Sequence, residues 1–198
     1  MKVRFTERMT GFYGVGAPGY DTGEVIGRRD GIRLGFHLTI STDDVRDVLR
    51  DPHHTMHARG VVHCKEFAPA GIVTDGSFEV FAPAEHGRYT MRYRLPFDTA
   101  DGPMTLLGFK DVGNDWGFDM WPDTTTLYTR LVRGHAEWAA DDGGRDHARG
   151  ILRLNAAMFA RQLATFRGRP SAIGLFGLFF LERLLAAYTG PRHRSPLR

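Results

Sequence analysis

Residues 32–40, IRLGFHLTI, alternate between apolar and polar side chains. One face carries only apolar residues: Ile32, Leu34, Phe36, Leu38 and Ile40. The opposite face carries Arg33, Gly35, His37 and Thr39. A period of two with a single apolar face is typical of a β-strand that has a core on one side and solvent on the other. We therefore predict a strand here, with His37 on its polar face.

The next residues, STDDVRDVLRDP, predict a short helix over 43–50, because Ser41 or Thr42 can cap it and Pro52 ends it. Five later runs look like strands, with turn residues between them: 57–67, 76–82, 88–97, 104–113 and 123–133. Several short strands at regular spacing are typical of an antiparallel barrel or sandwich. We predict a mainly β protein, an antiparallel lipocalin-like (calycin) barrel with a short helix after its second strand.

Two of these runs suggest what lines the barrel. In RYTMRYRLPF one face carries an apolar set with hydroxyl groups, suited to a lumen wall: Tyr89, Met91, Tyr93, Leu95 and Phe97. In the last run, Thr124, Thr126, Tyr128 and Arg130 share one face, and Thr125, Leu127, Thr129 and Leu131 share the other. Alternation alone does not say which of these two faces points inward. The Tyr128 face would supply hydrogen bonds, and the Leu127 face a plain apolar lining.

The pattern changes after Gly134. Apolar residues at roughly helical spacing, from Ile151 to Phe166, predict one helix, and Gly168 with Pro170 end it. A second, strongly apolar helix follows over 171–188, and its uncharged run stops at Glu182, short of the roughly 18–20 residues of a membrane span. We expect both helices to pack on the barrel or on a second copy, which makes them the expected homodimer surface, and we expect no membrane span.

Residues 11–31 are rich in glycine and predict a long loop over the barrel mouth. Within them GVGAPG, Gly14 to Gly19, matches the glycine spacing of dinucleotide-binding proteins, which needs a strand before it and a helix after it. We read no helix in the YDTGEV that follows, and so expect no nucleotide site. HHTMH, at 53–57, places two histidines four residues apart, but it follows Pro52 at the entry to a strand and has no evident acidic partner, so we predict a polar turn and no metal.

Composition sets the broad class. The chain has 198 residues, 42% of them hydrophobic, which suits one domain: a barrel over about 1–135 and C-terminal helices over about 142–190. The net charge of +3 comes without a basic stripe interleaved with aromatic residues, so we expect no nucleic-acid partner. A single cysteine, Cys64, and an N-terminus without an apolar signal segment favour the cytoplasm. No cofactor is expected.

One short stretch, WGFDMWPDTTTLYTRL from Trp116, gathers aromatic and acidic side chains at a turn. Aromatic residues with a few fixed polar groups at a barrel rim are typical of a small apolar pocket. The predicted substrate-binding residues are Trp116, Trp121, Phe118, Met91, Tyr89 and Asp119. The predicted catalytic residues are Tyr128 and Tyr93, as hydrogen-bond donors, and His37, as a proton donor or base.

Five segments in order, MRYRLPF, TLLGFKDV, WPDTTTLYTRL, FARQLATFR and FGLFFLERLLAAY, resemble a region attached to cholesterol-oxidase-like flavin oxidoreductases of the GMC family in large actinobacterial proteins. The resemblance runs from about Ile32 to Tyr188 and concerns the accessory region, not the flavin module. It implies proximity to steroid-, lipid- or polyketide-like molecules. It implies neither a bound flavin nor any particular catalytic residue.

Three functions follow from these features. The first is a cofactor-independent cyclase or isomerase that holds a polyketide-, polyene- or steroid-like substrate in the barrel, as in natural-product biosynthesis. Such an enzyme works by positioning the substrate and polarising it with a few hydrogen bonds. The second is a carrier for a small hydrophobic ligand. The third is an interaction module for an oxidoreductase partner.

Overall fold

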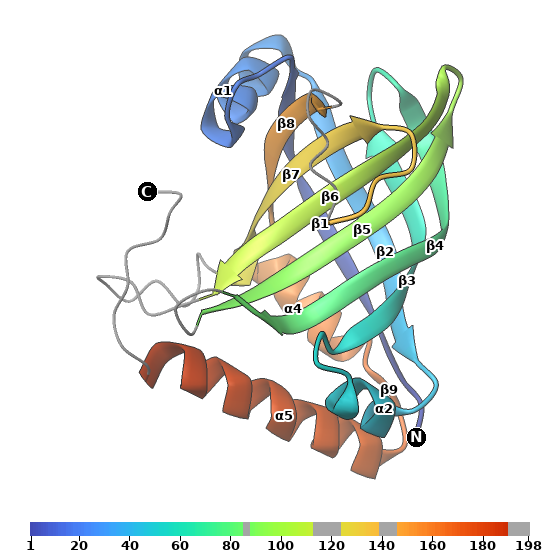
Figure 1. The fold of residues 1–198 in the computed structure, drawn as a ribbon, viewed down its shortest axis with the longest axis vertical. Coiled ribbons are helices and arrows are strands. Elements are labelled where there is room, and N and C mark those ends of the chain that lie inside the picture. Colours follow the sequence, from blue (N-terminus) through green and yellow to red (C-terminus); the bar gives the residue numbers. More distant parts are fainter. Residues whose placement is uncertain (85–87, 113–123, 139–145, 190–198) are drawn as a thin grey trace.

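The computed structural model describes residues 1–84, 88–112, 124–138 and 146–189 (Figure 1). Eight antiparallel strands form a closed barrel: β1 (Val3–Val15), β2 (Arg33–Thr42), β3 (Thr55–Cys64), β4 (Ala68–Pro83), β5 (Tyr89–Thr99), β6 (Gly102–Val112), β7 (Thr126–Arg133) and β8 (Asp146–Arg153). Each strand pairs with the next along the chain, and β1 closes the barrel by pairing with both β2 and β8. The predicted lipocalin-like barrel is therefore confirmed.

The helices lie at two ends of this barrel (Figure 1). Helix α1 (Tyr20–Asp30) packs outside β1 and β8 at one end, whereas α2 (Val45–Arg50) and the long α5 (Pro170–Thr189) lie at the other. The short helix α2 after the second strand is the predicted one. Asp44 caps it by accepting a hydrogen bond from the Arg46 amide at 2.9 Å.

The seam between β1 and β8 is paired over only part of its length. Strand β8 pairs with residues 10–15 of β1, and the chain then continues beside β1 as helix α4 (Ala156–Ala164). Thr165, just after α4, accepts a hydrogen bond from the Thr6 amide at 2.8 Å. A two-residue strand, β9 (Arg167–Gly168), then pairs with the start of β1. Helix α4 thus covers the part of the wall that β8 leaves unpaired.

Three sequence predictions about elements were wrong. The turn predicted between the runs 57–67 and 76–82 belongs to β4, which begins at Ala68. Residues 11–31 are not a long loop, because they hold the end of β1 and the whole of α1. The part of the predicted C-terminal helix before Arg153 is instead strand β8, so the barrel extends to Arg153 and not to about 135. The two C-terminal helices themselves, α4 and α5, are present as predicted.

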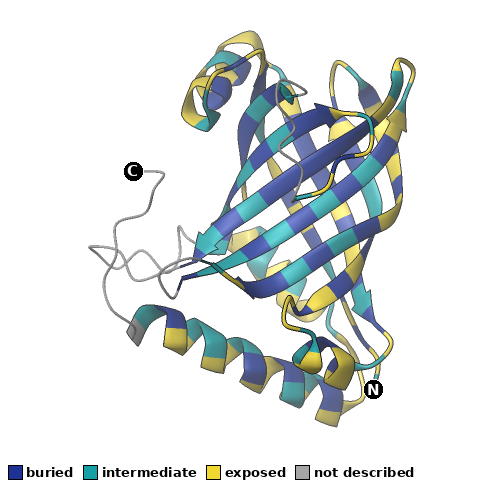
Figure 2. Cartoon of the chain, viewed as in Figure 1, coloured by how far each residue is buried: buried dark blue, intermediate teal, exposed yellow. Residues whose placement is uncertain are grey.

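Side chains alternate between the barrel interior and its surface, as the banded colouring of the strands in Figure 2 shows. In β5 four of the five residues predicted to face inward are buried, Met91, Tyr93, Leu95 and Phe97, and Tyr89 at the start of the strand is half-buried. In β7 the inward set is the Leu127 face, with Leu127, Thr129 and Leu131 buried. Tyr128 therefore lies on the outer side of the barrel.

Cys64 is fully buried inside the barrel, where its thiol donates a hydrogen bond to the Tyr13 hydroxyl at 3.1 Å. Burial raises the pKa of the Cys64 thiol, and the thiolate is the reactive form. We expect a thiol reagent at mildly alkaline pH to label the folded protein at least about tenfold more slowly than the urea-unfolded chain. Equal labelling rates in the two states, measured by absorbance of the released chromophore, would contradict this placement.

Candidate functional site

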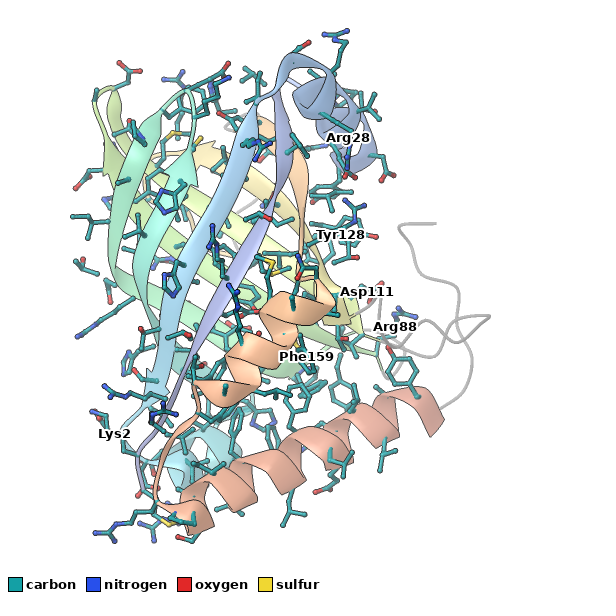
Figure 3. The ribbon with its side chains drawn as sticks, turned by 180° about the vertical axis from the view of Figure 1, so that it is seen from behind. Lys2, Arg28, Arg88, Asp111, Tyr128 and Phe159 are labelled. Atoms are coloured by element: carbon teal, nitrogen blue, oxygen red, sulfur yellow. The ribbon has the colours of Figure 1, made fainter. Side chains whose placement is uncertain are left out.

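A cavity of about 340 Å³ lies inside the barrel at the end that α4 and α5 cover. Most of its lining is apolar, contributed by strands and helices alike: Phe5, Phe78, Val80, Met91, Leu154, Phe159, Leu163, Phe166, Ile173, Phe176 and Phe180. Figure 3 shows Phe159 on α4, the helix that covers this part of the wall. This volume is at the small end of the range for ligand pockets, about 300–1,000 Å³.

Three polar side chains in the cavity wall form one connected cluster. Glu7 of β1 accepts a hydrogen bond from the Tyr93 hydroxyl of β5 at 2.7 Å through Oε2. Its other oxygen, Oε1, accepts one from Lys110 Nζ of β6 at 2.8 Å. Glu7 and Lys110 are only 2% and 3% exposed, and Tyr93 is fully buried. We call Glu7, Tyr93 and Lys110 the lumen cluster.

The surroundings of the lumen cluster keep the phenol protonated. Tyr93 packs between the rings of Phe36 and Phe78, with centroids 5.7 Å and 4.6 Å away. Burial, with the neighbouring Glu7 carboxylate, raises the pKa of Tyr93 well above its ordinary value. Tyr93 therefore stays a hydrogen-bond donor at all physiological pH values. Lys110 Nζ also lies 5.3 Å from the centre of the Tyr93 ring, where a cation interacts favourably with the ring face.

The cavity also contains hydrogen-bonding groups that no described residue satisfies. A lysine ammonium has three N–H donors, and Lys110 uses one of them on Glu7 with no second acceptor among the described residues. Gln162 of α4 lines the same cavity, and its Oε1 is buried without a partner in the described part of the chain. Buried polar groups are ordinarily paired, so these groups suit a ligand that carries oxygen atoms.

The structure brings two of the predicted site residues to this region, because Tyr93 and Met91 line the cavity. Tyr89 is not among the lining residues. Its hydroxyl accepts a hydrogen bond from Arg183 of α5 at 3.4 Å, and its ring meets that of Phe81. Trp116, Phe118, Asp119 and Trp121 lie outside the described residues, so their predicted role in binding stays a prediction.

The other two predicted residues lie on the outer surface. Tyr128 stacks on Phe109 at 5.5 Å and meets Tyr20 of α1 edge to face, also at 5.5 Å, outside the barrel (Figure 3). His37 is exposed, as its position on the polar face of its strand predicted, and it pairs across the strands with Arg8. Neither residue lines the cavity, so the geometry gives them no part in chemistry there.

Sequence reasoning missed Glu7 and Lys110. The signal was present, because each is a lone charge in the apolar phase of a strand. Glu7 lies in phase with Val3, Phe5 and Met9, and Lys110 with Met104, Leu106 and Val112. A charge in such a phase faces the core, where it needs a partner.

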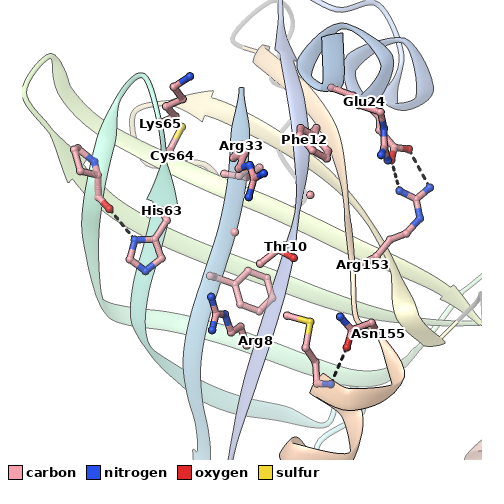
Figure 4. A pocket seen from close by; sticks show the side chains of 17 residues that line it. Arg8, Thr10, Phe12, Glu24, Arg33, His63, Cys64, Lys65, Arg153 and Asn155 are labelled. Carbon is pink, nitrogen blue, oxygen red and sulfur yellow. Dashed lines mark hydrogen bonds and ion pairs between the residues drawn. The ribbon is translucent and has the colours of Figure 1, made fainter. Parts of the chain in front are cut away.

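A larger hollow, about 730 Å³, lies on the outer surface and is lined by residues of β1, β2, α1 and α4 among others (Figure 4). Its polar side chains include Arg8, Arg33 and Lys65, and the ion pair of Glu24 with Arg153 closes one side. Its residues and those of the cavity do not overlap. It is a solvated basic surface and is separate from the lumen cluster.

The GVGAPG segment lies in a different setting from the one predicted. Strand β1 precedes it and α1 follows it directly, with Gly19 at the helix N-cap, so the stated reason for excluding a nucleotide was wrong. The strand belongs to an antiparallel barrel, however, and Arg149 donates a hydrogen bond to the Pro18 carbonyl in this turn. A dinucleotide site instead lies at the end of a parallel β-α-β unit.

The histidine-rich turn holds structural contacts. His54 is buried, donates a hydrogen bond from Nδ1–H to the Val48 carbonyl at 2.9 Å, and meets the ring of Phe179. Among the residues that the structure describes, no group of three His, Cys, Asp or Glu side chains is placed to hold a metal ion.

Comparisons with protein-family models, with curated proteins and with solved structures gave no significant match.

Proposed function

We propose that the protein binds a small, mostly apolar, oxygen-bearing molecule in the barrel cavity and isomerises or cyclises it without a cofactor. The observation that carries this proposal is the lumen cluster, a buried acid, base and phenol in the wall of an apolar cavity. A buried ion pair adds little stability compared with a well-packed apolar core. Buried ionisable groups that face a cavity are instead a common feature of catalytic sites.

The cluster contains the groups for proton transfer next to a carbonyl. The free N–H groups of Lys110 can donate hydrogen bonds to the carbonyl oxygen of a bound ketone. The Glu7 carboxylate can then take a proton from the adjacent carbon, so that a C–H bond breaks, an O–H bond forms on Glu7, and the negative charge moves to the substrate oxygen beside Lys110. Return of the proton to another carbon completes an isomerisation. For a cyclisation, the enolate carbon attacks a second carbonyl carbon of the same molecule, the π bond of that carbonyl breaks, and the proton held by Glu7 passes to the new alkoxide oxygen.

The test uses deuterium exchange with a steroid-like cyclic ketone as the probe. In heavy water the protein is expected to accelerate deuterium incorporation at the carbon next to the carbonyl, measured by mass spectrometry. Tyr93→Phe removes the phenol hydrogen bond to Glu7, and we expect it to slow exchange about tenfold while probe binding changes by less than about twofold. The matched control is Tyr128→Phe, the same change on the outer surface, which should leave the exchange rate unaltered.

The outcomes separate the candidate functions. Binding of the probe, measured by quenching of intrinsic fluorescence, without exchange or turnover would identify a carrier. The lumen cluster is also compatible with a carrier. Glu7 is hydrogen bonded to both Tyr93 and Lys110 when the cavity is empty, so the cluster is stable without a reaction. Equal loss of exchange in Tyr93→Phe and Tyr128→Phe would contradict the site assignment, and so would the absence of any binding.

A further inference from the structure

Helix α5 is apolar on two opposite faces. Its inner face, with Ala172, Phe176 and Phe179, is buried against the barrel end. On the other side Leu178 is 68% exposed and Leu181 is 52% exposed, and Gly174 and Leu185 extend the same row at helical spacing. A helix that is apolar all round is ordinarily buried on all sides, so the outer row is a surface that a partner covers.

Helix α5 carries two charges, and Glu182 is exposed at the flank of this row, four residues after Leu178. Arg183 points inward, where its guanidinium lies 5.8 Å from the centre of the Tyr89 ring. Over Pro170–Tyr188 the helix has a mean hydropathy of 1.5, and it is the one described helix that is long and apolar enough to cross a membrane. Its inner face, however, is held by the barrel. An apolar helix fixed in this way can lie along a bilayer surface but cannot cross the bilayer without leaving the barrel.

A group of basic side chains lies beside the beginning of α5. A surface hollow there is lined by Lys2, Arg4, Arg46, Arg167 and Arg169, and Figure 3 shows Lys2 at this end of the barrel. We call these five residues the basic rim. Lys2 and Arg46 pair with acids of the α2 region, whereas Arg4, Arg167 and Arg169 have no acidic partner among the described residues. Such a cluster suits the negative surface of a bilayer with anionic lipids.

The outer row of α5 also borders the cavity. Gly177 of α5 and Leu163 of α4 line the cavity, and both are exposed, Leu163 by 55%. The cavity therefore reaches the surface between α4 and α5 at Gly177, which lies one helical turn from Gly174 and Leu181 of the outer row. An apolar molecule that leaves a bilayer at this face would enter the cavity without crossing water.

From the outer row, the basic rim and the adjoining cavity opening, we infer that this end of the barrel docks on a membrane surface that contains anionic lipids. Leu178 and Leu181 enter the interface between headgroups and acyl chains, and Arg4, Arg167 and Arg169 contact the lipid phosphates. The inference goes beyond the proposed function and does not depend on any reaction in the cavity.

The experiment is cosedimentation of the full chain with phosphatidylcholine vesicles, with and without phosphatidylglycerol. We expect binding to the anionic vesicles that weakens as salt is added. Arg167→Gln with Arg169→Gln should lower the partition coefficient by about fivefold for each arginine removed. Leu178→Gln with Leu181→Gln should lower it by at least about tenfold, because both leucines leave the apolar layer.

Two matched pairs serve as controls. Val25→Gln with Ile72→Gln changes two apolar residues, each 67% exposed, on α1 and on the barrel wall. Arg8→Gln with Arg59→Gln removes two exposed arginines from the outer face of strands β1 and β3. Both pairs should bind vesicles like the unchanged protein, and circular dichroism should show that all four double variants are folded.

Three results would overturn the inference. The first is no binding of the unchanged protein to anionic vesicles. The second is equal loss of binding in the control pairs. The third is a dimer, seen by light scattering after size exclusion, that Leu178→Gln with Leu181→Gln converts to a monomer without any effect on vesicle binding. That last result would assign the outer row to a second copy of the chain.

Discussion

Replacing Lys110 by methionine is expected to lower the free energy of unfolding by about 3–5 kcal/mol, because it leaves the Glu7 carboxylate buried without its charged partner. Glu7 is 2% exposed and accepts hydrogen bonds only from Lys110 and Tyr93 among the described side chains. Methionine fills a volume similar to that of the lysine stem, so loss of packing contributes little. Urea unfolding followed by circular dichroism measures the change.

Two further variants show whether the charge is the cause. Lys65→Met makes the same substitution at an exposed lysine, which hydrogen bonds to the Gly31 carbonyl at 3.2 Å, and should change the free energy of unfolding by less than about 0.5 kcal/mol. Adding Glu7→Gln to Lys110→Met removes the unpaired charge and should recover at least half of the lost stability. If Lys110→Met costs less than about 1 kcal/mol, the carboxylate does not depend on Lys110.

The same glycine-to-alanine change is expected to have opposite effects in two helices. In α1, a Cβ on Gly27 would lie 2.2 Å from the Tyr13 carbonyl oxygen, which is strand backbone and cannot move aside. We expect Gly27→Ala to lower the free energy of unfolding by about 1–3 kcal/mol, or to detach α1 from the barrel. In α5, Gly174 has no atom near its Cβ position, so Gly174→Ala should raise that free energy by up to about 1 kcal/mol.

Hydrogen exchange of the backbone amides shows whether Gly27→Ala destabilises the whole barrel or only detaches α1. Loss of protection confined to α1 would mean that the helix detaches while the barrel persists. Loss across β1 and β8 would mean that the barrel itself is weakened. If Gly27→Ala and Gly174→Ala had the same free energy of unfolding, the close approach of α1 to β1 would not be needed for stability.

Strands were predictable where apolar and polar residues simply alternate, and they were missed where a buried charge or close packing interrupts that alternation. Strands β2 and β5 have uninterrupted apolar phases, so their inward faces could be predicted. Strand β1 has the same period, but Glu7 stands in its apolar phase. In α1, Gly23 and Gly27 suggest a loop because glycine disfavours helices. The structure shows that they let the helix lie directly on strand backbone, where any side chain would collide.

Strand β8 was mistaken for helix for a different reason. Ile151 and Leu154, with Met158 of α4, have roughly helical spacing because a strand passes quickly into a helix there. The candidate site was predicted only in part, because its residues come from several strands. Tyr93 and Met91 follow a regular alternation, but Glu7, which accepts the hydrogen bond of Tyr93, lies 86 residues away in the sequence. Only the barrel register brings Glu7 to Tyr93 and to Lys110 of the neighbouring strand β6. Local patterns contain no information about such pairing.

The pairing of β1 with β8 has a consequence for how the chain folds. Thr10 of β1 pairs with Arg153 of β8, so the barrel cannot close until β8 is available to pair with β1. A high proportion of such distant contacts makes folding slow. During synthesis at a ribosome, β1 and β7 would each present an unpaired edge until β8 has emerged, and exposed edges favour association between chains. Conditions that slow elongation near residue 146 should therefore increase aggregation of the newly made protein.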